Sequence, residues 1–315
     1  MNALIGNGPK TIITRFAPSP TGYLHLGHVA SAIFVWGVAR AASARVLLRM
    51  EDHDLGRCRR DYEEAIFADL AWLGFAHDNT DFRFAVNSTY RQSDAGAHFE
   101  SALSELIASG QVYACNCSRQ EILLRNRSAN AEELRYDGYC RTRGIPLDAP
   151  DVGLRLQIPT TELRFDDLRL GMQTQTPALQ CGDLLLKDRH GQYTYNFAVV
   201  VDDLRQGINL VIRGEDVLHA TGRQLWLADK LGGSDAISYF HHPLIMGSNG
   251  QKLSKRLLAS AIASRRLAGE DPRVLLGEAA QAVGLLAAAR PLTVLELPQL
   301  LSTHFLKRGR SNGGI

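Results

Sequence analysis

The first 75 residues alternate between two patterns of apolar positions. Residues 11–16 are rich in β-branched side chains, which is typical of a strand, and residues 46–50 form the short apolar run expected of a buried parallel strand. Apolar side chains recur at helical spacing over residues 28–42. They do so again from Asp61, where Glu64 three residues later resembles a capping box. This order of strand, helix, strand and helix predicts a doubly wound α/β sheet.

The pattern becomes less regular between residues 111 and 182. Three cysteines, a turn region rich in glycine and proline, and short strand-like pieces predict an inserted subdomain there. Parallel-sheet character then returns, with a strand at 208–213 and a helix at 221–231. We therefore divide the chain into residues 1–110 and 183–256 as two halves of one α/β domain, 111–182 as its insertion, and 257–315 as a short helical C-terminal segment.

Composition narrows the class of protein only slightly. The chain has 315 residues, and 35 Lys and Arg against 33 Asp and Glu give a formal net charge of +2. This balance excludes a protein that coats nucleic acid by bulk charge, so any such contact requires a local basic patch. No apolar run approaches the roughly 20 residues of a membrane-spanning helix, and residues 1–10 lack the features of a signal peptide. From this absence of a long apolar run we expect no membrane partner. Because the five cysteines are odd in number, we expect no disulfide scaffold and a reducing, cytoplasmic location.

Two short motifs indicate a nucleotide site. His25, Gly27 and His28 stand where a loop passes into a predicted helix, so both imidazoles could donate to phosphate oxygens and a base could stack on the glycine backbone. Lys252 and Lys255 stand on a loop flanked by glycine and could clamp a polyphosphate. Each motif alone is weak, since surface histidines and solvated lysines are common. Their occurrence together, in this order on an α/β background, favours a nucleotide-binding enzyme.

Longer motifs carry a family resemblance. The segment from Arg15 to Gly22, followed by His25 to His28, resembles the opening of class I glutamyl-tRNA synthetases, and so do residues 48–52, 195–203 and 211–216. Residues 252–256 are similar to the second signature loop of that family, with Arg256 where the usual pattern ends in Ser. The resemblance implies a Rossmann-type class I aminoacyl-tRNA synthetase catalytic domain with an inserted zinc-containing subdomain.

Length refines this resemblance. Full-length glutamyl-tRNA synthetases carry a large helical anticodon-binding region after the signature loop, and we expect the 59 residues that follow Arg256 to be too few for it. The chain thus resembles the truncated paralogues, the glutamyl-Q tRNA(Asp) synthetases. This resemblance implies that the protein is a monomer that activates L-glutamate with ATP and Mg²⁺, without needing tRNA. It also implies that the protein transfers the glutamate to queuosine in the anticodon stem-loop of tRNA(Asp). The alternatives are a truncated synthetase that charges a tRNA 3′ end and a non-catalytic tRNA-binding paralogue.

The resemblance also implies roles for individual residues. Glutamate has two carboxylates and one ammonium, so its pocket needs a guanidinium and a carboxylate, and strand ends of an α/β sheet are where ligands bind. Glu51 is expected to hold the ammonium, and Tyr195 and the arginines the carboxylates, whereas Asp52, His53 and Asp54 are expected to be loop or surface residues. The implied glutamate pocket comprises Arg15, Ala17, Ser19, Glu51, Tyr195 and Arg213. The implied ATP-binding residues are His25, Gly27, His28 and Lys255, and the implied catalytic residues are His25, His28, Lys252 and Lys255.

The cysteines of the insertion suggest a metal. Cys115, Cys117 and Cys140 lie close together in sequence, in a subdomain with little obvious core, which favours a structural zinc ion. The family resemblance implies Tyr136 as the fourth ligand, with Tyr139 as the competitor. The alternative is that these are free buried cysteines, which behave as small apolar residues.

Overall fold

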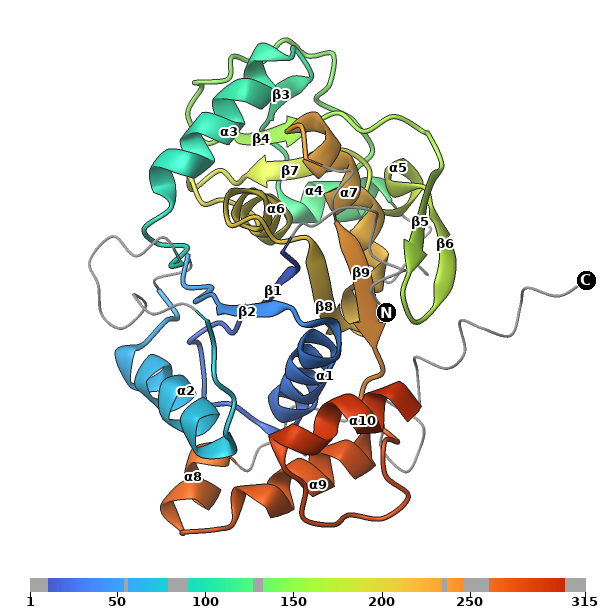
Figure 1. Ribbon diagram of the computed structural model, residues 1–315. Coiled ribbons are helices and arrows are strands. Elements are labelled where there is room, and N and C mark those ends of the chain that lie inside the picture. The colour runs from blue at the N-terminus through green and yellow to red at the C-terminus, as the bar shows by residue number, and fades with distance from the viewer. Residues whose placement is uncertain are drawn as a thin grey trace, which may run out of the picture.

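The computed structural model describes residues 11–53, 56–78, 90–126, 133–233, 237–245 and 261–303. Its strands form mixed sheets, shown in Figure 1. Strand β1 (Ile13–Phe16) pairs in parallel with β2 (Arg45–Leu48), and β8 (Leu210–Gly214) pairs in parallel with β9 (Ser238–His242). On its other side β9 meets β5 (Leu163–Asp167) in parallel, and β5 is antiparallel to β6 (Gly171–Gln175). The α/β prediction is therefore confirmed, but the sheets are not purely parallel.

The side chain of Asn209 joins β1 to β8. The backbone N–H of Ile13 donates to Asn209 Oδ1 at 2.8 Å, and Asn209 Nδ2 donates to the carbonyl of Thr11 at 3.0 Å. The backbone N–H of Asn209 in turn donates to the carbonyl of Ile13 at 3.1 Å. A side-chain amide offers the same donor and acceptor as a peptide unit. Asn209 thereby places the ends of β1 and β8 next to one another.

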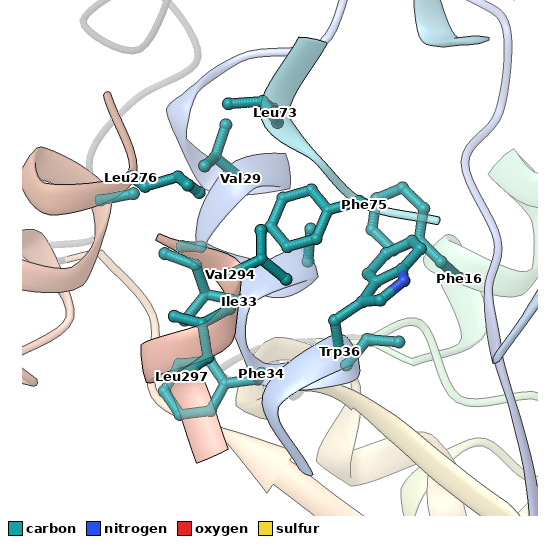
Figure 2. Close-up of a cluster of buried hydrophobic side chains, with 14 of the residues drawn as sticks. Phe16, Val29, Ile33, Phe34, Trp36, Leu73, Phe75, Leu276, Val294 and Leu297 are labelled. Atoms are coloured by element: carbon teal, nitrogen blue, oxygen red, sulfur yellow. The ribbon is translucent and has the colours of Figure 1, made fainter. Parts of the chain in front are cut away.

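Helix α1 (Leu26–Ala42) lies at the centre of the main core. It is apolar on nearly all sides, and it packs between the strands and the C-terminal helices α9 (Pro272–Ala282) and α10 (Leu297–Leu301), as Figures 1 and 2 show. Trp36 is buried against Phe16 and Phe75. At Gly37 a Cβ would come within 2.3 Å of Leu301 Cδ1, so the close approach of α10 requires the absence of a side chain there. The 3₁₀ turn η3 (Val294–Glu296) leads into α10.

The helix predicted from Asp61 begins one residue earlier, as α2 (Arg60–Leu73). The predicted capping box is absent: the N-cap residue is Arg59, which makes no side-chain cap bond, and Glu64 instead pairs with Arg60 at 2.9 Å. The predicted C-terminal helical segment is present within the described residues, because α8 (Ile262–Leu267), α9 and α10 all lie there. Helix α8 packs on α2 through a bond from Arg266 Nε to the buried Asp69.

The middle of the chain forms a third sheet, which is antiparallel. Its strands are β3 (Val112–Cys115), β4 (Gly153–Leu156) and β7 (Leu184–Lys187). The surrounding helices are α3 (Gly96–Ala108), α4 (Arg119–Arg125), α5 (Pro177–Gln180), α6 (Tyr195–Arg205) and α7 (Thr221–Lys230), with η1 (Glu215–Ala220) before α7. The hairpin β5–β6, although it lies within residues 111–182, joins the sheet of β8 and β9. Within the described residues, no helix is both long and apolar enough to cross a membrane.

Candidate functional site

Charged side chains gather where the parallel strands end. Arg15 is the penultimate residue of β1, Arg213 is the penultimate residue of β8, and Glu51 follows β2 by three residues. All three are more than nine-tenths buried. Arginine and glutamate are seldom buried unless they are paired, so each of them should have partners.

Two buried arginines share one carboxylate of α6. Asp203 Oδ1 accepts from Arg15 Nε at 3.0 Å and from Arg49 Nη1 at 2.6 Å. Arg49, which is fully buried, also donates from Nη2 to Glu51 Oε1 at 3.3 Å and from Nη1 to Gln206 at 3.2 Å. The guanidinium of Arg49 therefore bridges Asp203 and Glu51, and it holds Glu51 in place.

The pKa values of the two carboxylates in this cluster are shifted in opposite directions. Burial raises the pKa of Glu51 above its ordinary value, although Arg49 and Arg15 act in the other direction. Burial also acts to raise the pKa of Asp203, but the two guanidiniums in contact with it hold that pKa below its ordinary value. Asp203 is thus a fixed anion. Burial disfavours the ionised form of Glu51, which an incoming cation would stabilise.

Arg213 is held by neutral acceptors. Its Nε donates to His241 Nε2 at 3.0 Å, its Nη1 to Gln224 Oε1 at 2.6 Å, and its Nη2 to Thr221 Oγ1 at 2.8 Å. Arg213 also lies over the ring of Tyr239, with Cζ 5.3 Å from the ring centroid. A guanidinium has five N–H donors, so one donor on each Nη is left for a ligand.

The remaining predicted pocket residues are more exposed than the buried arginines. Tyr195 begins α6, and its side chain is 39% exposed. Burial of the hydroxyl end raises the pKa of Tyr195, while the nearby charges of Arg213 and Glu51 act on it in opposite directions. Ala17 is half-buried and Ser19 is exposed in the loop after β1. The structure therefore brings Tyr195 together with the buried arginines and leaves Ser19 accessible to a ligand.

The two histidines of the first short motif form the cap of α1. His25 Nδ1 accepts from the backbone N–H of Gly27 at 3.1 Å, and His28 Nδ1 accepts from the backbone N–H of His25 at 3.0 Å. Because both Nδ1 atoms accept, each neutral ring carries its proton on Nε2. The helix cap thus fixes which nitrogen of each ring is a donor.

A cavity of about 200 Å³ opens beside this cap. It is lined by His25, Gly27 and His28, by residues that follow β8, and by residues at the end of β9. On the β9 side His242 lies 3.2 Å from Ser31 Oγ and stacks on Phe34, and burial lowers the pKa of His242 to about 4. The cavity therefore has neutral imidazoles on two of its walls. Lys252, Lys255 and Arg256 lie outside the described residues.

Asp52 lies in the loop after β2, as predicted, but it is not at the surface. It is almost completely buried, and it accepts from Arg91 Nη1 at 2.8 Å and from the backbone and hydroxyl of Ser93 at 2.9 and 2.8 Å. His53 is half-buried, with Nδ1 2.6 Å from Gln92 Oε1. Asp54 lies outside the described residues. A carboxylate accepting three hydrogen bonds can be buried at little cost, and its partners lie some forty residues further along the chain.

The three cysteines of the insertion converge. The Sγ atoms of Cys115, Cys117 and Cys140 all lie within 4.8 Å of one another. The thiol of Cys115 donates to the Tyr136 hydroxyl at 3.4 Å, and the same hydroxyl accepts from the backbone N–H of Cys140 at 2.8 Å. Tyr139 instead is 49% exposed, and its ring is covered by Arg125 at 4.3 Å. Of the two tyrosines, only Tyr136 therefore lies among the thiols.

Sequence reasoning missed several residues that hold the site together. The list comprises Arg49, Asp203, Gln224, Thr221, His241 and Asp167. The sequence did contain a signal for Arg49 and Asp203, because a charged residue directly after or within a buried apolar run needs a buried partner. For His241 and Asp167 the pairing depends on strand register, and for Thr221 and Gln224 it depends on how α7 packs on the sheet; the sequence alone fixes neither.

Comparison with known proteins shows the family of this chain. A family model described as "tRNA synthetases class I (E and Q), catalytic domain" matches residues 11–290. The glutamyl-Q tRNA(Asp) synthetase of Symbiobacterium thermophilum is 36% identical over 90% of this chain and 90% of the relative, and that of Geobacter sulfurreducens is 38% identical over 87% and 84%. A glutamate–tRNA ligase of Nitrosococcus oceani is 38% identical over 84% of this chain and 55% of the ligase.

A solved structure shares the fold. The glutamate tRNA ligase of Elizabethkingia meningosepticum, solved in complex with its amino acid, superposes with a TM-score of 0.75 at 24% identity, over 92% of this chain and 64% of the ligase. The chain thus spans about two thirds of that ligase. The match to the family model covers every described residue of the site. The chain belongs to the class I tRNA synthetases (E and Q), within their catalytic domain, and it is a ligase of the aminoacyl-tRNA synthetase type.

Proposed function

We propose that the protein activates L-glutamate with ATP, without needing tRNA, and transfers the glutamyl group to queuosine in the anticodon of tRNA(Asp). The observation that carries the first half is the set of buried charges at the strand ends, where Arg15, Arg213 and Glu51 face one region beside Tyr195. Support for the second half comes from the relatives that bear this name, which the chain matches over 84 to 92% of their own length.

The pocket suits an amino acid with two carboxylates. Glu51 would hold the α-ammonium, since a buried carboxylate with a raised pKa gains most from a cation. Arg213 offers one N–H on each Nη, and Arg15 offers Nη2, because its Nε and Nη1 already donate to Asp203 and to the carbonyl of Ile212. Tyr195 would close the pocket over the side-chain carboxylate. Glutamine would leave an amide NH₂ facing arginine donors, so the pocket favours the acid.

ATP would lie in the cavity beside the cap of α1. The Nε2–H groups of His25 and His28 would donate to its phosphates, and Gly27 leaves room for the base. The α-carboxylate of glutamate attacks the α-phosphorus, the bond to the β-phosphate bridging oxygen breaks, and pyrophosphate leaves with the electron pair. Mg²⁺ would neutralise phosphate charge when bound. We propose the same electrostatic role for Lys252 and Lys255, with Lys255 in contact with the transition state.

The cysteine cluster is suited to a structural zinc ion. Three thiols and one phenol within reach of a common centre provide four ligands, although a tyrosine ligand is uncommon. Cys115, Cys117, Tyr136 and Cys140 would hold the metal. It would tie the end of β3 to the turn that contains Cys140, and its role would be to stabilise the insertion, which we propose as the part that contacts the tRNA stem.

One experiment tests both halves of the proposal. The purified monomer, whose oligomeric state is checked by light scattering, is incubated with labelled glutamate, ATP and Mg²⁺, and with tRNA(Asp) or tRNA(Glu), each with and without queuosine. We expect glutamate-dependent ATP–pyrophosphate exchange without any tRNA, and label transfer only to tRNA(Asp) that contains queuosine. Charging of tRNA(Glu), or equal labelling with and without queuosine, would refute the transfer step. Absence of exchange would refute the activation step.

A further inference from the structure

Three strands bring three buried polar residues into one line. In the register of β8 and β9, Arg213 lies opposite His241, and β5 ends at Asp167 next to β9. Arg213 Nε donates to His241 Nε2 at 3.0 Å, and His241 Nδ1 lies 2.7 Å from Asp167 Oδ2. His241 and Asp167 are at most 1% exposed, and Arg213 is 7% exposed. The line therefore runs from the candidate pocket into the sheet, away from solvent.

Hydrogen-bond chemistry allows only one protonation state along this line. A guanidinium nitrogen can only donate, so His241 Nε2 must be an acceptor. The proton of the neutral ring then sits on Nδ1, from which it donates to the carboxylate of Asp167. Burial lowers the pKa of His241, with opposing contributions from Asp167 and from the neighbouring Arg213 and Arg169, so the ring stays neutral.

Asp167 is itself fixed by backbone donors. Its Oδ1 accepts from the N–H groups of Arg169 and Leu170 at 3.1 and 2.9 Å, and its Oδ2 also accepts from the N–H of His241 at 3.1 Å. Arg169 further donates to the carbonyl of His241 and pairs with Glu215. The carboxylate cannot rotate without losing several of these bonds. It therefore determines the tautomer and the orientation of the imidazole.

We propose that the His241–Asp167 pair is a positioning device, which fixes the guanidinium of Arg213 so that its two uncommitted N–H groups point at a carboxylate of the amino-acid substrate. This inference rests on the proposed function, because it takes Arg213 as a contact to glutamate. Gln224 and Thr221 hold the two Nη atoms, and His241 holds Nε, so each nitrogen has one fixed partner. A preorganised donor pair of this kind strengthens binding of the amino acid but not of ATP.

The test substitutes His241 in two ways and measures glutamate-dependent ATP–pyrophosphate exchange. In His241→Leu the acceptor for Arg213 is lost. We expect the KM for glutamate to rise about 10- to 100-fold, the loss of a hydrogen bond to a charged group, with the KM for ATP changed less than about twofold. His241→Gln keeps one acceptor and one donor, and should restore the glutamate KM to within about fivefold of the unaltered protein.

If His241→Leu does not fold, a variant of the carboxylate, Asp167→Asn, still tests the inference. In Asp167→Asn the amide must turn its NH₂ either toward Arg169 and Leu170, which already donate, or toward His241 Nδ1. The second orientation moves the ring proton to Nε2, where it faces the donor of Arg213, so the glutamate KM should rise here too. The matched control is Asp69→Asn, a buried carboxylate that pairs with Arg266 in α8.

The outcomes separate the two proposals. Two results would overturn the positioning role and leave the proposed function standing. In the first, the glutamate KM is unchanged in His241→Leu. In the second, the glutamate KM rises together with the ATP KM, or rises no more than it does in the control Asp69→Asn. A lack of exchange in the unaltered protein would overturn both. Nitrogen NMR of protein labelled at histidine adds a direct readout. The signals that disappear in the spectrum of His241→Gln belong to His241, and they should show a proton on Nδ1 at neutral pH. A proton on Nε2 would refute the inference.

Discussion

Replacing Arg49 by methionine should strongly destabilise the protein, because it removes a cation from among buried anions. The guanidinium is fully buried, 2.6 Å from Asp203, 3.3 Å from Glu51 and, through Nε, 3.9 Å from Asp202. Asp203 retains Arg15, but Glu51 loses the partner that donates to it. Methionine matches the length of the arginine stem, so the change removes charge and hydrogen bonds more than it removes volume.

The size of the effect follows from the cost of an uncompensated buried charge. Breaking a buried ion pair from one side costs about 3–5 kcal/mol of unfolding free energy. For a chain of this size each kcal/mol moves the melting temperature by roughly 2–4 °C, so we expect a fall of about 6–20 °C. By contrast, the pair of Arg60 and Glu64 has side chains 74% and 50% exposed, and its loss should cost less than about 1 kcal/mol.

The stability that Arg49→Met loses should also depend on pH, in a direction that the pKa shifts determine. Without Arg49 the pKa of Glu51 should rise further and that of Asp203 should rise from its lowered value, since a nearby cation that favours their ionised forms is gone. A group whose pKa is raised on folding contributes stability below its unfolded value and loses it as the pH rises through the folded value. The gap in stability between the unaltered protein and Arg49→Met should therefore be larger at pH 8 than at pH 5.

Thermal unfolding followed by circular dichroism at the two pH values checks this prediction, with Arg60→Met as the control for loss of an arginine in an ion pair. If Arg49→Met melts within the margin of Arg60→Met, or if its deficit is larger at pH 5, the charge cluster does not stabilise the fold in the way the contacts indicate.

Three further predictions concern the pocket, the metal cluster and the sheet. Glutamate binding, measured by calorimetry, should weaken as the pH falls through the raised pKa of Glu51. Glu51→Gln should bind glutamate weakly, with little pH dependence in that range. If binding to the variant still weakened at acid pH, this role of Glu51 would be contradicted. Tyr136→Phe should lower zinc affinity at least about tenfold by competition with a chelator, while Tyr139→Phe should not, and equal effects would remove Tyr136 from the ligand set. Asn209→Ala should lower the unfolding free energy in urea by about 1–3 kcal/mol, because backbone groups of β1 lose their partners; no loss would show that water replaces the amide.

Local patterns predicted the elements well. The β-branched run, the helical spacing of α1 and the short apolar run of β2 all depend on residues close in sequence, and each element was found within a few residues of its predicted place. The capping box predicted at the start of α2 was wrong, because Glu64 pairs with the side chain of Arg60 and not with a backbone N–H. Residue types at the strand ends were also readable, since Arg15 and Arg213 stand within motifs.

Partners distant in sequence were not predictable. Arg15 meets Asp203 at a separation of 188 residues, and His241 meets Asp167 at 74. The first pair depends on how α6 packs on β1. The second requires the register between β5 and β9, and a one-residue slip would turn each side chain to the other face of the sheet. Asp52 shows the same limit: its loop position was predicted but its burial was not, because Arg91, which neutralises it, is not visible in its local sequence.

The two arginines of the candidate pocket are not equivalent, and the difference lies in what holds them. Arg15 shares the carboxylate of Asp203 with Arg49, so a substrate carboxylate at Arg15 competes with an anion that is already bound. Arg213 is held by a neutral imidazole, an amide and a hydroxyl, and the nearest carboxylate of that line, Asp167, lies on the far side of the ring. Its positive charge is therefore less compensated before a ligand arrives. Because a charged hydrogen bond gains most where no other anion neutralises the donor, the selectivity of the pocket for a carboxylate should be concentrated at Arg213.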